Sequence, residues 1–480
     1  MNRVPRLLNY SKDLLLPEET VRDIRLDTLF SKETVEILRR PCGREEIKRR
    51  NSIFRALESG ASLKRLDDLL SILCALEKKI SLVKDEKIAL IRYFRYAQML
   101  DAYTCASKCI AESGDLFGEI GEYYSSDKEL SRSGEILCSA NRIKDIIERM
   151  RIGLISLSDK CWITPDRKSV SEIEIISECA EKLGLCTGIK KEGKVKINEP
   201  FSDAVCRLYS ECAERIDAEI KVISLDDIAI PVAFISELRF FSEIAHFVRR
   251  AEGRGILHCI SDISETKCYE AEELYDISLL SENCGSIVPN GLAMNAEEPF
   301  FFVCGANGGG KTTFLRAVGI NLVLFLAGCP VFAEKAEIYP FDCVLSHFPK
   351  DERFDDVGRL EEELSRTEKL LAEVQGNTAF FLYNETYSGA NEKRGFELLC
   401  DTVKRITEGG HFGLYVTHFH GVKELEYPVL SAAVDTDNKN ERTFKIVRSK
   451  GSASSYASDI LRKYRLDKES LERRRAGYGD

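Results

Sequence analysis

A glycine-rich segment followed by a lysine and a threonine is the part of the sequence best suited to bind phosphate. Glycines let successive backbone N–H groups point toward phosphate oxygens, and the amino terminus of a following helix adds a favourable dipole. In such a loop Lys311 reaches the β- and γ-phosphates, the Thr312 hydroxyl is a Mg²⁺ ligand, and Thr313 belongs to the same binding segment. The segment therefore predicts a site for a nucleoside triphosphate with Mg²⁺. It reads Gly305-Ala306-Asn307-Gly308-Gly309-Gly310-Lys311-Thr312 and fits the pattern GxxxxGK[ST].

The segments on either side favour this interpretation over that of a glycine-rich turn that matches by chance. An apolar run, Phe300–Cys304, precedes the loop, and an amphipathic helix is predicted to begin at Thr312. Further short β-type runs at residues 379–383 and 413–417 alternate with helical patterns, one of which begins at residue 392. Strands separated by helices of this length predict a parallel sheet with helices on both faces.

Two of the predicted strands are followed by side chains that could act on a bound triphosphate. Asn384 and Glu385 follow the run at residues 379–383, and His418 follows the run at residues 413–417. Glu385 is the candidate base for polarising the attacking water, and Asn384 is a candidate for the metal shell that brings no negative charge. His418 is a candidate for sensing or stabilising the γ-phosphate. The alternatives are a solvated glutamate and a structural histidine at ordinary strand ends.

Composition restricts the class of protein and its compartment. The 480 residues include 69 Lys and Arg against 79 Asp and Glu, a net charge of −10, so any DNA contact would have to come from local basic patches. We find no run of about 20 apolar residues that would span a membrane and no secretory signal at the amino terminus. The seventeen cysteines are scattered without a CxxC pair, which is typical of a reducing, cytoplasmic environment.

The fold class that we predict is a multidomain α plus α/β protein. Apolar residues recur mostly at helical intervals before about residue 280, and the alternating β and helical pattern begins there. We therefore expect a helical region over residues 1–280, a P-loop domain with a parallel-sheet core over residues 281–450, and a short helical tail over residues 451–480.

Taken together, the motifs resemble those of the MutS family of DNA-mismatch-repair ATPases, in the ABC-type class of P-loop proteins. Residues 305–319 resemble the family's phosphate loop and helix, and residues 416–418 match its strand-end Thr-His. Pro289 and Asn290 resemble a Pro-Asn turn that contacts the nucleotide in the family. Residues 384–395 align with the family's signature loop, and residues 455–474 resemble its helical dimerisation element.

The resemblance implies an ATPase that works as a homodimer. In the family, each ATP lies between the phosphate loop of one subunit and the signature loop of the other. Ala390 and Asn391 stand at the serine–threonine positions of that signature loop, so Asn391 would be the donor to a phosphate across the interface. The region before residue 280 would be the helical core and lever. It is too short for the mismatch-reading domain as well, so we expect that domain to be missing.

The function that we predict is ATP-dependent DNA binding of the MutS type, through shape and phosphate contacts rather than base readout. Two alternatives stay open. One is a nucleotide-gated clamp or scaffold with little or no turnover, which Asn384 favours, and the other is an ABC-type ATPase acting on a protein partner. The candidate DNA contacts are Lys190, Lys191, Lys194 and Lys196, and Arg142 with Lys144. The alternative for each is a solvated surface patch, which is the more common reason for such lysine pairs in soluble proteins.

Overall fold

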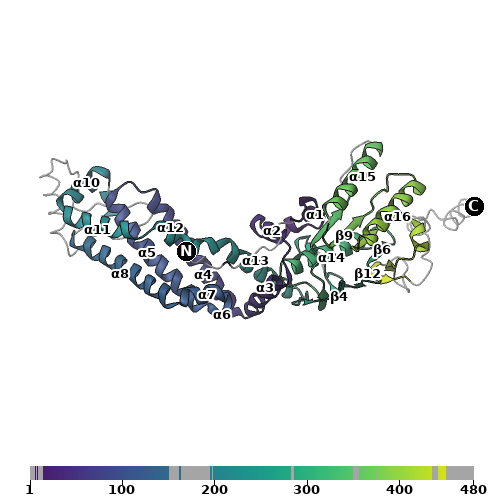
Figure 1. The fold of residues 1–480 in the computed structure, drawn as a ribbon, viewed down its shortest axis with the longest axis horizontal. Coiled ribbons are helices and arrows are strands. Elements are labelled where there is room, and N and C mark those ends of the chain that lie inside the picture. The colour runs from purple at the N-terminus through teal and green to yellow at the C-terminus, as the bar shows by residue number, and fades with distance from the viewer. Residues whose placement is uncertain are drawn as a thin grey trace, which may run out of the picture. The chain divides into compact units, whose positions relative to one another are not determined.

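The computed structural model describes residues 6, 8, 15–150, 162–163, 195–196, 198–282, 286–349, 356–374, 376–434 and 442–449. The chain forms two compact units (Figure 1). The first, called here the helical unit, consists of residues 1–7 and 56–242, and the second, the sheet unit, consists of residues 8–55 and 243–480. The chain passes from one unit to the other after residue 7, again within α3 (Arg44–Leu57) and a third time within α13 (Ile235–Glu252).

The helical unit is built around three long helices, α4 (Gly60–Lys84), α5 (Ala89–Glu112) and α8 (Asp127–Arg149). Helix α5 packs against both α4 and α8. Along α4 the buried residues recur three or four positions apart, as an amphipathic helix requires, and they include Leu66, Leu69 and Leu73. The shorter elements of the unit are α6 (Gly114–Phe117), α7 (Glu119–Ser125), β1 (Trp162–Ile163), β2 (Val195–Lys196), α10 (Glu199–Leu208), α11 (Ser210–Val222), α12 (Leu225–Ala229) and η2 (Ile230–Phe234).

The sheet unit contains a six-stranded sheet of order β12-β11-β6-β10-β9-β8. Neighbouring strands from β11 to β8 are parallel, and β12 pairs with β11 in the antiparallel sense. Every residue of β6, β8, β9 and β10 is buried, which is typical of a parallel sheet covered on both faces. The strands are β6 (Phe300–Cys304), β8 (Cys343–His347), β9 (Ala379–Asn384), β10 (Phe412–Val416), β11 (Val429–Val434) and β12 (Arg442–Arg448).

Three helices cover the two faces of this sheet. On one face, α15 (Asp356–Glu373) and α16 (Glu392–Glu408) bury leucine and isoleucine side chains against the aromatic residues of β6, β9 and β10. On the other face lies α14 (Lys311–Leu326), where a Cβ added to Gly319 would lie 2.6 Å from Leu382 of β9. The predicted sheet with helices on both faces is therefore confirmed.

A second, four-stranded sheet of order β3-β7-β4-β5 also belongs to the sheet unit. It packs on the α14 side of the larger sheet, where the Tyr269 hydroxyl donates a hydrogen bond to the Val318 carbonyl oxygen of α14 (3.4 Å). Its strands are β3 (Asp262–Ile263), β4 (Cys268–Leu274), β5 (Asn290–Asn295) and β7 (Lys335–Ile338). The connecting 3₁₀ turns are η3 (Ile277–Glu282) and, after β10, η4 (His420–Glu424).

The structure differs in two ways from the expectation of a helical region up to residue 280. Strands β3 and β4 lie before that residue, so part of the sheet unit begins earlier than the sequence pattern indicated. In addition, residues 8–55 belong to the sheet unit, with α1 (Glu18–Asp23), η1 (Leu26–Thr28) and α2 (Lys32–Leu38). Apolar periodicity shows that a segment is helical, but it does not show which distant core buries the apolar face.

Three other expectations concern the helical tail, the cysteines and membrane-spanning segments. The predicted tail over residues 451–480 lies outside the described residues. The cysteines within the described ranges carry no disulfide. No helix in the described part of the chain has the length and apolar character needed to cross a bilayer.

Candidate nucleotide-binding site

The glycine-rich loop connects β6 to α14, as its motif requires. Gly305, Gly308 and Gly310 have positive φ angles of 125°, 68° and 90°, which side-chain-bearing residues rarely adopt. Gly309 is required for a different reason, because a Cβ there would lie 2.9 Å from Cβ of Ala432 and 3.0 Å from the carbonyl oxygen of Ala306. The loop is therefore shaped by glycine at each of these positions.

Lys311 is the first residue of α14, and its side chain is held inside the loop. Its ammonium donates to the carbonyl oxygens of Gly305 (2.8 Å) and Ala306 (3.2 Å) and to Oδ1 of Asn307 (3.2 Å). The residue is 4% exposed, and a buried ammonium needs such acceptors to offset its lost hydration. This places a positive charge where the loop would hold phosphate oxygens. Thr313, two residues on, is half-buried in the first turn of α14.

The strand order brings the other predicted residues to the same edge of the sheet. Strand β10 lies between β6 and β9, so the carboxyl ends of all three are neighbours. At this edge the Thr312 hydroxyl donates to Oδ1 of Asn384, the last residue of β9, at 3.3 Å. Both groups offer oxygen atoms, which Mg²⁺ prefers as ligands or as hydrogen-bond partners of its bound waters. The two residues predicted for the metal shell thus fit a Mg²⁺ ion in type and in placement.

Glu385 and His418 also meet here. Nε2 of His418 lies 2.8 Å from Oε1 of Glu385, and Nζ of Lys311 lies 4.0 Å from the same oxygen. The hydrogen bond from His418 is the main reason why the pKa of Glu385 lies below its usual range, with burial opposing it and the charge of Lys311 adding to it. The lowered pKa favours the ionised carboxylate of Glu385, and its side chain is partly exposed, so it could accept a proton from a nearby water.

Two of the residues expected to contact nucleotide, Asn290 and Pro289, have structural partners. Nδ2 of Asn290 donates to the carbonyl oxygen of Phe444 (3.1 Å), and its Oδ1 accepts from the amide of Ile446 (2.6 Å), so the side chain joins β5 to β12. The carbonyl oxygen of Pro289 accepts from Nζ of Lys445 (2.6 Å).

Asn391 is the amino-terminal cap of α16. Its Oδ1 accepts a hydrogen bond from the backbone amide of Arg394 at 2.9 Å, and the side chain is exposed. Ala390, beside it, donates its amide to the carbonyl oxygen of Tyr387. The capping role leaves the amide group of Asn391 available to a second partner.

Two residues that shape the site were not among the predicted site residues. Ala432 of β11 packs against two loop glycines, and a buried carboxylate of α15, Glu363, accepts a hydrogen bond from the amide of Tyr387 (2.8 Å). These residues lie far from the motifs along the chain.

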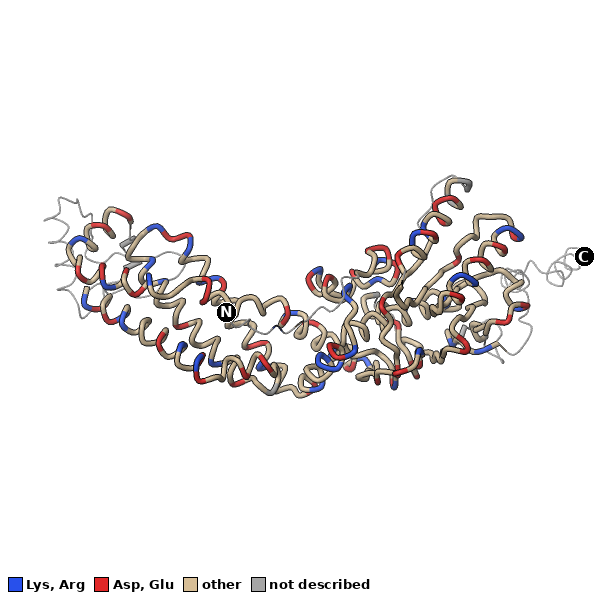
Figure 2. The backbone as a smooth tube through the Cα atoms, viewed as in Figure 1, with Lys and Arg blue, Asp and Glu red and all other residues tan. Residues whose placement is uncertain are grey.

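The basic residues proposed to contact DNA are only partly described. Lys190, Lys191 and Lys194 lie outside the described residues, and the side chain of Lys196 in β2 does as well. Arg142 forms an ion pair with Glu219 (2.7 Å), and Lys144 forms one with Asp101 (2.7 Å). Figure 2 shows basic and acidic residues interspersed along the described backbone. Local acidic partners therefore reduce the positive field at Arg142 and Lys144.

Fold and site together define an α/β domain with a candidate phosphate-binding loop at the carboxyl edge of a parallel sheet. Residues 301–473 match the family model of MutS domain V. Over this region the chain is similar to members of the MutS family, the resemblance that its motifs predicted.

The chain is similar to several curated members of that family, each over part of its length. It is 32% identical to the DNA mismatch repair protein Msh2 of Dictyostelium discoideum over 126 residues, which are 26% of this chain and 13% of the relative. It is 25% identical to the DNA mismatch repair protein MutS of Caldicellulosiruptor bescii over 200 residues, 39% of this chain and 23% of the relative. It is 24% identical to the endonuclease MutS2 of Maridesulfovibrio salexigens over 191 residues, which are 39% of this chain and 25% of the relative. The chain thus spans a quarter or less of the length of these relatives.

Proposed function

We propose that this protein binds ATP with Mg²⁺ at the loop after β6 and hydrolyses it. The observation that carries the proposal is the convergence of Lys311 and Thr312 with Glu385 at the ends of neighbouring parallel strands. A phosphate loop alone would support binding only. The ionised carboxylate opposite the loop supports hydrolysis as well.

Each residue has a separable role in this reaction. The loop amides and Lys311 hold the β- and γ-phosphates, and Glu385 accepts a proton from the water that attacks the γ-phosphorus as the bond to the β-phosphate oxygen breaks. His418 lowers the pKa of Glu385 and orients its carboxylate through the 2.8 Å contact. Thr312 and Asn384 would hold Mg²⁺, which neutralises phosphate charge when it is bound.

The test is steady-state phosphate release from MgATP, with direct measurement of ATP binding. We expect Glu385→Gln to bind ATP as the wild type does while kcat falls by about 100-fold or more, because the base is removed and the loop is not. Lys311→Ala should instead weaken ATP binding. Turnover that survives Glu385→Gln unchanged would contradict the proposed role of Glu385.

Asn384 favours a second candidate function, a nucleotide-gated clamp that turns ATP over slowly. The amide brings no negative charge to the metal shell, although its oxygen already faces Thr312 at 3.3 Å. Restoring the charge with Asn384→Asp should therefore raise turnover, most clearly when Mg²⁺ is scarce. If the wild type already hydrolyses ATP rapidly and Asn384→Asp adds nothing, the clamp with little turnover is excluded.

We further propose that the protein binds duplex or branched DNA and that ATP closes a homodimer around it. The support is the match to MutS domain V and to relatives whose names include DNA mismatch repair. Phosphate-driven binding should weaken steeply as salt rises, which fluorescence anisotropy with labelled duplex and branched DNA can measure. An affinity that does not change with salt would exclude this mode of DNA binding and would favour a protein partner.

A further inference from the structure

The residues that follow β9 are held in a backbone conformation that side-chain-bearing residues rarely adopt. Glu385 has a φ angle of 51° and Tyr387 one of 65°. Both lie in the left-handed region, where a Cβ crowds the backbone, so the turn costs free energy. Such a turn persists only where surrounding contacts hold it, and here it carries the proposed catalytic base.

Three elements supply the contacts that hold this turn. The Thr386 hydroxyl donates to the carbonyl oxygen of His347 at the end of β8 (3.3 Å), and the Tyr415 hydroxyl of β10 donates to the carbonyl oxygen of Thr386 (3.0 Å). Glu363 of α15 accepts the amide hydrogen of Tyr387 (2.8 Å). The turn therefore depends on the end of β8 and on α15 as well as on its own strand.

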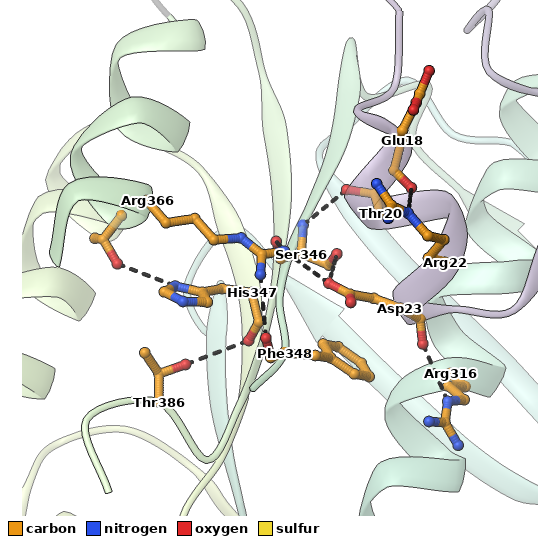
Figure 3. Close-up of polar contacts among 11 residues, drawn as sticks. Glu18, Thr20, Arg22, Asp23, Arg316, Ser346, His347, Phe348, Arg366 and Thr386 are labelled. Carbon is orange, nitrogen blue, oxygen red and sulfur yellow. Dashed lines mark hydrogen bonds and ion pairs between the residues drawn. The ribbon is translucent and has the colours of Figure 1, made fainter. Parts of the chain in front are cut away.

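The end of β8 is in turn fixed by a helix from the beginning of the chain. Ser346 donates its amide to the Thr20 hydroxyl (3.2 Å) and its own hydroxyl to Oδ2 of Asp23 (2.6 Å), as Figure 3 shows. Thr20 and Ser346 are 0% and 1% exposed, so these bonds are made away from water. Because β8 is the edge strand of the sheet, α1 takes the place that a further strand would occupy.

Arg366 of α15 closes the same network from the other side. Its guanidinium donates to Oδ2 of Asp23 (3.0 Å) and to the carbonyl oxygens of Ser346 (3.1 Å) and Phe348 (3.2 Å) (Figure 3). Arg366 lies three residues after Glu363, one turn along α15. Helix α15 therefore contacts the strained turn through Glu363 and contacts α1 through Arg366.

We call Thr20, Asp23, Ser346 and Arg366 the α1 latch. We propose that Asp23 and Arg366 of the α1 latch are positioning residues for Glu385, fixing the end of β8 and the register of α15 so that the turn after β9 keeps its strained conformation. This inference rests on the proposed ATPase function for its catalytic consequence only. Its structural consequence, order at residues 385–387, can be measured without turnover.

The decisive variant is Asp23→Asn, which keeps the size of the side chain and removes the charge shared by Arg366 and Ser346. Amide hydrogen exchange should become faster at residues 385–387 and 346–348, and exchange in α5 of the helical unit should stay as in the wild type. Turnover should fall about tenfold in kcat with KM for ATP changed less than about threefold, because the base is misplaced while the phosphate loop is intact. Asp23→Glu, which keeps the charge, should recover part of the loss.

Arg22→Ala is the matched control, since Arg22 lies on α1 beside Asp23 but is exposed and bonds only within its own helix in the contacts described. It should leave both exchange and kcat unchanged. If Asp23→Asn does not fold, Ser346→Ala removes only the 2.6 Å hydrogen bond to Asp23. It should change amide exchange and kcat in the same direction, by a smaller amount. Unchanged exchange at residues 385–387 in both latch variants would overturn the inference, whether or not ATP is hydrolysed. Absent turnover in the wild type would instead count against the proposed function.

Discussion

The contact between Glu385 and His418 determines how the proposed base responds to pH. The hydrogen bond from His418 lowers the pKa of Glu385, and burial only partly opposes it. A lowered pKa favours the ionised carboxylate in the folded protein. This contribution to stability is present above the pKa of the unfolded chain and is lost as pH falls through the folded value.

The first prediction follows for the variant His418→Gln. Without the imidazole, the pKa of Glu385 should return toward its ordinary value, so the acidic limb of the kcat–pH profile should move to higher pH. At neutral pH kcat should also fall by about 10- to 100-fold, because the carboxylate loses its orienting partner. A profile measured from pH 4.5 to 8 checks both effects, with ATP affinity as the control for folding. An acidic limb at the wild-type position would show that His418 does not act through Glu385.

For individual residues, the sequence predicted best those polar side chains that directly follow a strand. Lys311, Thr312, Asn384, Glu385 and His418 were predicted to act on the same bound triphosphate. The structure brings Thr312 within hydrogen-bonding distance of Asn384, and both His418 and Lys311 within hydrogen-bonding or ion-pairing distance of Glu385. Their roles toward nucleotide remain proposals.

Asn290 shows where the same reasoning stops. Its side chain bonds to the backbone of Phe444 and Ile446, more than 150 residues later in the chain. The local Pro-Asn pattern contained no information about that strand. Only the antiparallel return of β12 to the edge of the sheet brings the two segments together.

Asn391, at the amino terminus of α16, has two candidate roles. Asn391 caps the helix through its side-chain oxygen. The family resemblance implies in addition that its side chain donates a hydrogen bond to a phosphate across a dimer interface. An asparagine can do both, since its oxygen accepts and its nitrogen donates. Two substitutions separate these roles.

The second prediction compares Asn391→Ala with Asn391→Asp. Alanine removes the cap and should lower the free energy of unfolding by about 1 kcal/mol in urea titrations. Aspartate keeps a capping oxygen and should be as stable as the wild type, but it offers no N–H and would repel a phosphate. ATP-dependent dimerisation should therefore be lost in Asn391→Asp without loss of stability. If Asn391→Asp dimerises normally, the residue is a cap and no more.

The elements around the loop were predictable to within a residue or two. Phe300–Cys304 was predicted as a strand and is β6, and the helices expected from Thr312 and from residue 392 begin at Lys311 and Glu392. These are long or fully apolar segments with strong local signals. Strand β4, with glutamates on its exposed positions and an antiparallel partner on each side, has a weaker pattern and was not separated from the helical region before it.

For the molecule as a whole, the unexpected feature is the place of residues 8–55 in the sheet unit. Ile24 is fully buried, and a Cβ added to Gly319 of α14 would lie 2.9 Å from it. The amide of Cys42 donates to the carbonyl oxygen of Leu326 at the end of the same helix (2.8 Å). The partner of this segment lies some 280 residues away in the chain, a distance at which hydrophobic periodicity gives no signal.

The third prediction concerns assembly, because the proposed function requires two copies of the chain to close around ATP. The bound γ-phosphate would join two surfaces, so the dimer should depend on nucleotide state. Glu385→Gln is the best form for the measurement, since it should bind MgATP and hold it unhydrolysed. Light scattering should show a mass near twice 54.2 kDa with MgATP and a mass near 54.2 kDa without it.

Lys311→Ala is the matched control, because it should lose nucleotide and with it the dimer, while the remainder of the surface stays the same. A dimer that formed equally well without nucleotide would show that ATP does not gate association. A chain that stayed at 54.2 kDa at high concentration with saturating MgATP would leave the site as a nucleotide pocket without a partner. In that case, the hydrogen bond that Asn391 accepts from the amide of Arg394 would account for the whole role of the signature asparagine, and coupling between ATP and DNA would need a route within one chain.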